Sequence, residues 1–452
     1  MEQMTLREIA GAVHGKLLHT DGAVWIDKVS TDSREADGSA LFVALKGERF
    51  DGHDFIDDFY RGGGAAAISE RETEGPGILV EDTLLALGDL ARHYRGKFRL
   101  PVVGVTGSAG KTSTRTMIES VLATAGATCA TRGNLNNDIG LPRTLLTLDS
   151  AHKYAVIEMG MNHAGEIRYL TNIARPDIAV ITNVGTAHIG NLGSREAILR
   201  AKLEILEGLN PGGLALLNGD DERLYARKLR LPCRAVYYGI RNPACDLIAR
   251  DAACGALESR FRAGDDEFIV RAPGEHHVYN ALAAIAAGLA LGLPAADIQK
   301  GVADFRPADM RQTMAEFGGV RVIEDCYNAN ADSMEAALAV LAASGAGGRK
   351  IAVLGDMLEL GEFTDAEHRR VGACAARHKI DLVVTVGEYA AAIAVEARLG
   401  GAEAIHVDSN AQALQTLLEL LRPGDTVLVK ASRSARFEEI SHGLRAFLTK
   451  SL

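Results

Sequence analysis

One stretch of fourteen residues, PVVGVTGSAGKTST at 101–114, constrains the fold more than any other part of the chain. It begins with a short, valine-rich apolar run that is typical of a buried strand. The chain then turns through Gly107 and Gly110 and enters an expected helix at Lys111. Such a turn presents free N–H groups and the positive end of a helix dipole to an anion, which predicts a cradle for a nucleotide triphosphate. The residues expected to form this cradle are Thr106, Gly107, Ser108, Ala109, Gly110, Lys111, Thr112 and Ser113.

The spacing of the glycines leaves a second interpretation open. The common phosphate loop has a glycine where Val105 stands, and Gly104 comes one residue early. The glycines could instead form a dinucleotide-binding fingerprint, which requires an acidic residue about twenty residues later. The next expected strand, 129–131, leads into Arg132 without such an acid. A lysine that reaches terminal phosphates and a threonine that ligates Mg²⁺ favour the triphosphate.

The pattern along the rest of the chain predicts an α/β fold. A chain of 452 residues is expected to form about three domains. Apolar strands alternate with helices after residue 101, which predicts a parallel sheet covered on both faces. We expect a small N-terminal α/β substrate domain at 1–97, a central parallel-sheet P-loop ATPase domain at 98–307, and a Rossmann-like, doubly wound domain at 308–452. Strands are expected at 101–106, 154–159, 178–183, 213–218 and 235–239, helices at 111–126, 164–174, 194–208 and 221–230, and an antiparallel excursion at 241–273.

Composition restricts the compartment and the partners. With 47% hydrophobic and 24% charged residues the chain is expected to be globular, and a net charge of −10 argues against a broad nucleic-acid-binding surface. The six cysteines show no paired metal spacing, which favours a reduced, cytoplasmic protein. The N-terminus does not have the pattern of a signal peptide, and no apolar run reaches about twenty residues. We therefore expect a soluble protein without stable membrane association.

Ligands of parallel sheets bind beyond the carboxyl ends of the strands, which selects further candidates. Glu158 follows one strand, and a carboxylate facing a triphosphate suits Mg²⁺, although Glu158 could equally be a helix-start acid. His188 follows the next strand, and on its own residue type it is more typical of a structural or phosphate-contacting histidine than of a Mg²⁺ ligand. Lys202, in the helix after that, has the pattern of a solvent-facing lysine.

Several polar segments could bind substrate. Four side chains of the first module, Ser33, Arg34, Lys46 and His53, sit beside turns, although exposed charges there are more often only solvated. The basic segment 91–100 is interpreted as a linker. The loop 131–146 carries Asn136 and Asn137, which suit hydrogen bonds to a sugar, a phosphate or a peptide, or else serve only as turn residues. His276 and Asn280 lie four residues apart on one helix face, and an asparagine can bind adenine. The last α/β unit, with its polar strand ends, is expected to act as a lid.

With these landmarks together, the sequence resembles the Mur ligases of peptidoglycan synthesis over nearly its whole length. The marks shared across that family are TGSAGKT, the EMG at 158–160, Asn183 with His188, AKLE, and the His276/Asn280 helix. The segments LKGERFDGHDF, NLNNDIGLP, DCYNANADS, LGDMLELGE and VKASRS resemble the member that adds a D-alanyl-D-alanine dipeptide. The offset glycine of the cradle is itself the pattern of the family. The departures from the family pattern are Asp138, His277, Met310, Ala331 and Ala431.

The resemblance implies an ATP-dependent ligase that makes an amide bond through an acyl phosphate. Its implied small-molecule substrates are UDP-N-acetylmuramoyl-tripeptide and D-alanyl-D-alanine, and the protein is expected to be a cytoplasmic monomer in cell-wall synthesis. Lys111 would contact the β- and γ-phosphates, Thr112 and Glu158 would hold Mg²⁺, and His188 and a carbamylated Lys202 would belong to a second metal site. The nucleotide would also contact His276, Asn280, Arg311 and Asp325. The substrates would contact Ser33, Arg34, Lys46, Asn136, Asn137, Tyr327, Asn328, Asn330 and Arg433.

Three other functions compete with this one. A related ligase, either the diaminopimelate- or lysine-adding Mur enzyme or a folylpolyglutamate-type synthetase, would share the cradle, but the chain has no DNPR-type motif. A guanine-nucleotide switch would need an Asn-Lys-x-Asp element, which the chain does not contain. A dinucleotide dehydrogenase would not need the Lys111–Thr112 pair.

Overall fold

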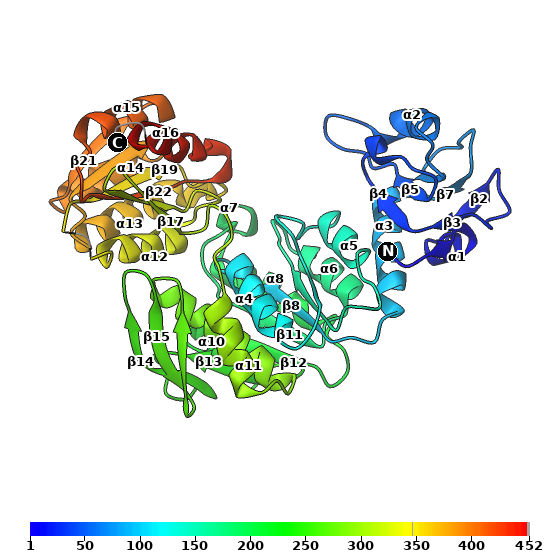
Figure 1. The fold of residues 1–452 in the computed structure, drawn as a ribbon, viewed down its shortest axis with the longest axis horizontal. Helices are drawn as coiled ribbons and strands as arrows, with labels where there is room; N and C mark the ends of the chain where they lie inside the picture. The colour runs from blue at the N-terminus through cyan, green and yellow to red at the C-terminus, as the bar shows by residue number, and fades with distance from the viewer. Residues whose placement is uncertain (346, 450–452) are drawn as a thin grey trace.

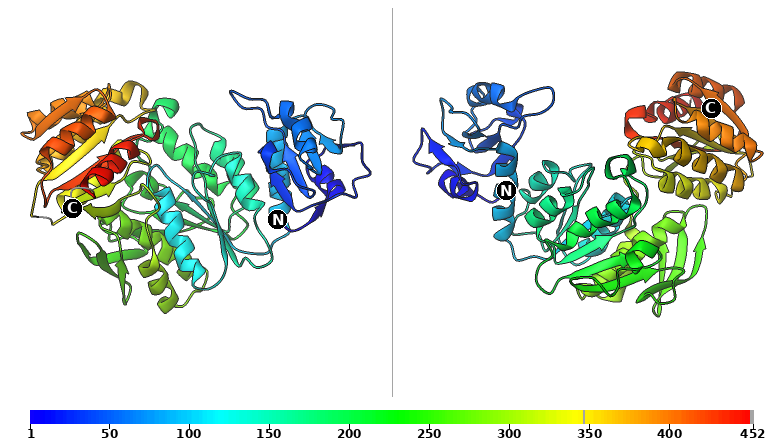
Figure 2. Two further views of the ribbon diagram at one scale, coloured as in Figure 1. Left: turned by 45° about the horizontal axis from the view of Figure 1, so that its top comes forward. Right: turned by 180° about the vertical axis from the view of Figure 1, so that it is seen from behind.

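The computed structural model describes residues 1–345 and 347–449 of the chain. These residues form three α/β lobes arranged in an arc, with the central lobe between the other two (Figure 1). The two further views in Figure 2 show the same separation of the N-terminal and C-terminal lobes. The α/β class with three domains that the sequence predicts is confirmed.

The N-terminal lobe is built on a five-stranded sheet in the order β2-β7-β6-β5-β4, parallel except for the antiparallel β2–β7 pair, beside a small β1–β3 ribbon. Its strands are β1 (Met4–Thr5), β2 (Lys16–Leu18), β3 (Trp25–Ile26), β4 (Lys28–Ser30), β5 (Ala40–Val43), β6 (Ala66–Ser69) and β7 (Gly77–Leu79). Its helices are α1 (Leu6–Ala12), α2 (Ile56–Arg61) and α3 (Thr83–Gly96), with 3₁₀ turns at Ser33–Glu35 and Gly52–Phe55.

The segment 91–100 is mostly helix, so its interpretation as a linker is wrong. Helix α3 continues to Gly96, and its last turns are buried because Tyr94 and Arg95 pack against the central lobe. The Tyr94 hydroxyl donates to the backbone oxygen of Leu148 at 2.5 Å, and the Arg95 side chain donates to that of Ala174 at 3.2 Å. The last turn of α3 therefore anchors the first lobe to the second.

The central lobe contains a nine-stranded sheet in the order β16-β15-β14-β13-β12-β11-β8-β10-β9, parallel from β9 through β14 and antiparallel at its β15 and β16 edge. Its strands are β8 (Val102–Thr106), β9 (Thr128–Ala130), β10 (Tyr154–Glu158), β11 (Ile178–Ile181), β12 (Leu214–Asn218), β13 (Arg234–Gly239), β14 (Leu247–Cys254), β15 (Ser259–Ala263) and β16 (Asp266–Val270). Its helices are α4 (Lys111–Ala123), α5 (Gly140–Leu145), α6 (Glu166–Ala174), α7 (Ile189–Leu192), α8 (Arg195–Leu203), α9 (Glu222–Tyr225), α10 (Glu275–Ala290) and α11 (Ala295–Asp304), with a 3₁₀ turn at Glu204–Leu206.

The alternation of side chains along β8 explains how this sheet is covered. Val103 and Val105 belong to a core shared with α4, α10 and α11, whereas Val102 belongs to the core shared with α5, α6 and α8. A strand buried on both faces requires the continuous apolar run seen in the sequence. The expected strands and the antiparallel excursion are confirmed, but the expected helix at 221–230 is only the single turn α9.

The C-terminal lobe has a six-stranded sheet in the order β17-β18-β22-β19-β20-β21, parallel except for the β17–β18 pair. Its strands are β17 (Thr313–Phe317), β18 (Val320–Glu324), β19 (Lys350–Gly355), β20 (Leu382–Val386), β21 (Glu403–Val407) and β22 (Thr426–Lys430). Its helices are α12 (Ala331–Ala342), α13 (Thr364–Arg377), α14 (Ala391–Leu399), α15 (Asn410–Leu420) and α16 (Glu438–Leu448), with 3₁₀ turns at Gly361–Phe363 and Arg433–Ala435. Among the described helices of the whole chain, none is long and apolar enough to cross a bilayer.

Candidate active site

A cavity of about 940 Å³ lies where the central and C-terminal lobes meet. Its walls include the cradle after β8, the end of β10, the loop after β11, and the strand ends of the C-terminal lobe. It also reaches Leu84 and Leu85 of α3 in the N-terminal lobe. The cavity therefore lies at the carboxyl ends of the central parallel strands, where ligands of open α/β sheets bind.

The cradle is a tight backbone turn whose geometry requires its glycines. Gly107 has φ 153° and a Cβ there would lie 1.8 Å from Thr182 Oγ1, while Gly110 has φ 80° and is the N-cap of α4. No side chain caps α4, so its first N–H groups face the cavity without a side-chain acceptor in the described residues. The turn is held by Asn183, whose Oδ1 accepts from the backbone N–H of Ala109 at 2.9 Å. An open helix N-terminus of this kind suits a phosphate.

Lys111 lies at the entrance of α4 and bends back over the cradle. Its Nζ donates to the backbone oxygen of Gly107 at 2.8 Å. Burial lowers the pKa of Lys111, and the negative charge of Glu158 opposes that effect. The lysine is therefore close to both the cradle and the carboxylate, as a group that contacts terminal phosphates would be.

Glu158 and Thr112 form a pair of oxygen donors beside the cradle. Glu158 is 2% exposed, and its Oε1 accepts from Thr112 Oγ1 at 3.2 Å and from Asn136 Nδ2 at 2.8 Å. Its Oε2 is buried without a hydrogen-bond partner in the described part of the chain, 3.9 Å from the Nε of Arg115. Oxygen donors with an unused lone pair fit Mg²⁺, which prefers a few carboxylate ligands and keeps several waters. No cluster of three or more His, Cys, Asp or Glu side chains with metal-binding geometry occurs among the described residues.

Lys202 differs from the expectation based on its residue type, whereas the role expected of His188 stays a prediction. Lys202 is 1% exposed, so the pattern of a solvent-facing lysine is wrong. Burial, and secondarily the charge of Lys111, lower the pKa of Lys202 well below its usual value. His188 has φ 62°, lines the cavity, and places its Nδ1 2.5 Å from Glu359 Oε2 of the C-terminal lobe. Lys202 is not among the residues that line the cavity, although it lies near Lys111.

The start of α10 forms another wall of the cavity. Asn280 is buried and accepts from Thr114 Oγ1 at 2.9 Å, and its Oδ1 lies 3.2 Å from the Cβ position of Gly110. Burial lowers the pKa of His276 to about 4, against a smaller raising effect from Asp325, so this ring is neutral near pH 7. Both residues line the cavity, and Asn280 lies beside the cradle.

The C-terminal lobe contributes the strand-end residues that the sequence singled out. Arg311 stacks over the ring of Tyr327 at 4.1 Å, and Asp325 pairs with Lys430 at 2.8 Å; all four line the cavity, together with Asn328 and Asn330. Arg433 is not among the lining residues and pairs instead with Glu438 at 3.0 Å.

The N-terminal candidates lie outside this cavity. Arg34 pairs with Asp32 at 2.6 Å, Lys46 forms an isolated bridge with Asp51, and Ser33 begins a 3₁₀ turn. His53 is buried and accepts from the backbone N–H of Glu70, which is a structural role. Asn136 and Asn137 do line the cavity, and Asn137 Oδ1 also caps α5 at the N–H of Gly140.

Several residues that line the cavity were not singled out from the sequence. They are Asn162, Tyr169, Asn218, Tyr238, Tyr279, Gln312, Asp332 and Lys430. Asn218 and Tyr238 sit near the ends of β12 and β13, so the strand-end rule that selected Glu158 could also have selected them.

Together, the fold and the site define a nucleotide-binding α/β enzyme whose phosphate cradle is covered by a second lobe. Three family models match the chain: "Mur ligase family, catalytic domain" at 26–95, "Mur ligase middle domain" at 105–288, and "Mur ligase, glutamate ligase domain" at 310–433. The chain belongs to the Mur ligase family.

Individual relatives match over nearly their full length. The UDP-N-acetylmuramoyl-tripeptide–D-alanyl-D-alanine ligase of Bacillus subtilis is 39% identical over 97% of this chain and 98% of its own. A crystal structure of MurF from Acinetobacter baumannii has a TM-score of 0.93 at 35% identity and covers 99% of both chains. MurF from Thermotoga maritima in complex with ADP has a TM-score of 0.85 at 31% identity, covering 94% of this chain and 98% of the other.

Proposed function

We propose that this protein is an ATP-dependent ligase that joins D-alanyl-D-alanine to UDP-N-acetylmuramoyl-tripeptide. The observation that carries the proposal is the full-length similarity to ligases with that printed activity, together with a cradle that has an open helix N-terminus and a half-buried lysine. The cavity is large enough for a nucleotide and the reacting ends of two substrates. The product would be a UDP-sugar pentapeptide, with ADP and phosphate released.

The reaction would proceed in two balanced steps. The terminal carboxylate of the tripeptide attacks the γ-phosphorus of ATP, which forms an acyl phosphate and releases ADP. The free amine of D-alanyl-D-alanine then attacks the acyl carbon, forms the amide bond, expels phosphate and loses a proton. The first step brings anions together, so positive charge and N–H donors at the phosphates must offset their repulsion. Lys111 and the first N–H groups of α4 supply that charge and those donors.

Glu158 and Thr112 would hold Mg²⁺ beside the phosphates. When bound, this ion supplies positive charge that neutralises phosphate oxygens. Asn136 fixes the carboxylate through its 2.8 Å bond, which leaves the second oxygen of Glu158 available. His188 would belong to a second metal site.

Lys202 would be carbamylated and would act as a carboxylate at the second site. A lysine takes up CO₂ only as the neutral amine, and burial favours that form. No hydrogen bond or ion pair to its side chain occurs among the described residues, so the amine is not committed to another partner. These features support the proposal of a modified lysine.

The remaining contacts are those that the resemblance to the Mur ligase family implies. His276, Asn280, Arg311 and Asp325 would hold the nucleotide, while Tyr327, Asn328, Asn330 and Arg433 would place the dipeptide. Ser33, Arg34 and Lys46 would bind the UDP end of the tripeptide, and Asn136 and Asn137 its peptide end.

We propose domain limits at 1–97, 98–307 and 308–452. We also propose that the protein is a monomeric cytoplasmic enzyme that serves peptidoglycan synthesis, and through it cell shape and division.

Phosphate release tests the proposed reaction directly. The purified protein is incubated with ATP, MgCl₂, UDP-N-acetylmuramoyl-tripeptide and D-alanyl-D-alanine, and each component is omitted in turn. We expect release only with the complete mixture, with the lysine and the diaminopimelate tripeptides assayed in parallel. Release with a free amino acid in place of the dipeptide would instead indicate a related ligase.

A further inference from the structure

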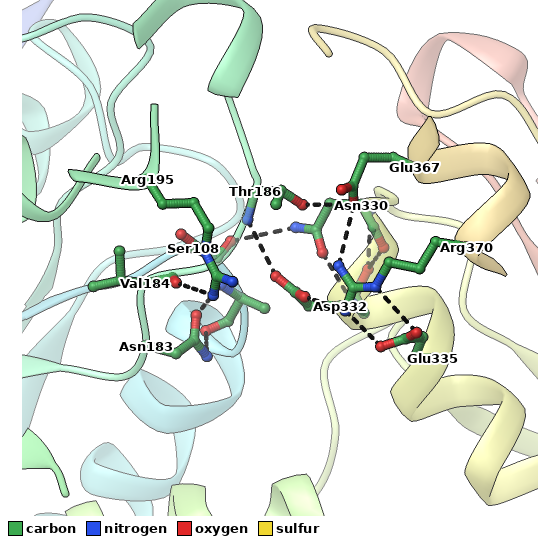
Figure 3. A network of polar contacts seen from close by, with 12 residues as sticks. Ser108, Asn183, Val184, Thr186, Arg195, Asn330, Asp332, Glu335, Glu367 and Arg370 are labelled. Atoms are coloured by element: carbon green, nitrogen blue, oxygen red, sulfur yellow. Dashed lines mark hydrogen bonds and ion pairs between the residues drawn. The ribbon is translucent and has the colours of Figure 1, made fainter. Parts of the chain in front are cut away.

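A cluster of charged side chains in the C-terminal lobe contacts the central lobe beside the cradle (Figure 3). We call it the Arg370 cluster: Asp332 and Glu335 on α12, and Glu367 and Arg370 on α13. The Arg370 guanidinium lies 2.8 Å from Asp332 Oδ1, 2.6 Å from Glu335 Oε2 and 3.1 Å from Glu367 Oε2. One guanidinium therefore orients three carboxylates on two neighbouring helices.

Two of these carboxylates also bind the loop 182–188 of the central lobe. Asp332 Oδ2 accepts from the backbone N–H of Thr186 at 3.2 Å, and Glu367 Oε2 accepts from Thr186 Oγ1 at 3.1 Å. The approach is so close that a Cβ at Gly185 would lie 1.9 Å from Asp332 Oδ2. The carboxylate can take this position only because residue 185 has no side chain.

The same loop holds the cradle at its other end. The backbone oxygen of Asn183 accepts from the N–H of Ser108 at 3.1 Å, and its side chain accepts from the N–H of Ala109. Asn330, the N-cap of α12, donates to the backbone oxygen of Ser108 at 3.5 Å. A short run of contacts therefore links Arg370 to the cradle through Asp332, the loop 182–188 and Asn183.

Partial burial distinguishes the Arg370 cluster from an ordinary surface ion pair. The side chain of Glu367 is 15% exposed and that of Asp332 27%, so these pairs are less screened by water than fully exposed ones, which contribute little. The adjacent Arg369 differs from Arg370 in the position of its partners. It pairs with Asp365 of its own helix and with Glu396 of α14, both in the C-terminal lobe.

We propose that Arg370 is a positioning residue that holds the C-terminal lobe against the loop 182–188 and thereby keeps the cradle in shape for nucleotide. Arg370 acts through Asp332 and Glu367 and is not among the residues that line the cavity. The part of the proposal that concerns nucleotide rests on the proposed function, because it takes ATP or ADP as the ligand of the cradle. The part that concerns the contact between the two lobes does not rest on the proposed function.

The first test measures the separation of the lobes without ligand. Small-angle scattering of full-length Arg370→Met should show a larger radius of gyration than the wild type, whereas Arg369→Met should superimpose on it. Gly185→Ala should reproduce the expansion from the opposite lobe, because its methyl group displaces Asp332 while the Arg370 cluster keeps its charges. The Gly185 variant also keeps the test valid if Arg370→Met does not fold. Wild-type dimensions in the folded variants would overturn the proposal.

The second test measures nucleotide binding by calorimetry with Mg²⁺ and ADP. Arg370→Met and Gly185→Ala should weaken ADP binding by roughly two- to thirtyfold, the range of coupling carried by such networks. Arg370→Lys should recover part of this loss, and Arg369→Met should bind like the wild type. Expanded variants that keep full ADP affinity would overturn the positioning role. If the wild type itself does not bind ADP, the proposed function fails. The small-angle scattering measurement would still test the proposed contact between the lobes.

Discussion

The hydroxyl oxygen of Thr112 lies 3.2 Å from Oε1 of Glu158, at the junction of α4 and the end of β10. The two residues are far apart in sequence, and they meet because β8 and β10 are neighbouring parallel strands whose register pairs Val105 with Glu158. Their oxygens face the same cavity as the cradle. This pair is the geometric basis for the proposed magnesium site.

Replacing Glu158 with glutamine should remove the effect of Mg²⁺ on nucleotide binding. The amide keeps the shape of the side chain but not its charge, and we expect turnover to fall by about 10²- to 10³-fold. Calorimetry of ADP with and without MgCl₂ provides the measurement, with the exposed Glu196→Gln as the matched control. A Glu158→Gln protein in which Mg²⁺ still strengthens ADP binding would rule out this carboxylate as a ligand.

Lys111→Ala should abolish ATP-dependent phosphate release while the protein remains folded. The change removes the only cation in direct contact with the cradle backbone among the described residues, so the γ-phosphate loses its charge partner. Circular dichroism checks the fold, and Lys300→Ala, on the exposed face of α11, serves as control. Near-normal turnover would exclude the cradle from the mechanism.

Lys202→Ala should be inactive and should regain part of its activity when acetate or propionate is added. A small carboxylic acid can occupy the space left by the side chain and replace the charge of a carbamate. The same acids should not restore Lys111→Ala, where an ammonium is missing. An unimpaired Lys202→Ala protein, or one that no acid rescues, would contradict the carbamate.

His276 should make the protein less stable as the pH falls below about 6.5. Its pKa in the folded chain is about 4 because burial disfavours the charged ring, while its ordinary value is 6.5. Between these values the unfolded chain binds more protons than the folded chain, so the free energy of unfolding decreases as pH falls through this window. His276→Gln should remove on the order of 2 kcal/mol of that decrease. Denaturant unfolding at pH 7 and pH 4.5 measures this change in the free energy of unfolding. The exposed control His442→Gln should behave like the wild type.

Much of the fold could be predicted because its signals are local. The apolar run at β8, the glycines at 107 and 110, and the lysine that follows all lie within a few residues, so their spacing predicts a strand, a turn and a helix. Glu158 could be placed near the cradle by the rule for parallel strand ends alone. The same local reasoning placed His276 and Asn280 on one helix face, and the structure shows that both line the cavity.

Local reasoning failed where burial depends on other parts of the chain. Lys202 lies in a helix with charged neighbours, yet tertiary packing removes it from water. The basic segment 91–100 has the composition of a linker, yet the Arg95 guanidinium donates to the backbone oxygen of Ala174 in the central lobe and to those of Phe98 and Leu100. Composition describes a residue's preference for water, but only packing decides whether water is present.

The sequence by itself determined the three α/β lobes, the phosphate cradle and its lysine, because strand period, helix start and turn chemistry are properties of neighbouring residues. Only the tertiary structure decided that Glu359 faces His188 and that Thr186 meets Asp332 across 146 residues of chain. Contacts of this kind depend on how whole lobes are oriented. No pattern of adjacent residues specifies that orientation, since many arrangements of the same strands and helices satisfy the same local rules.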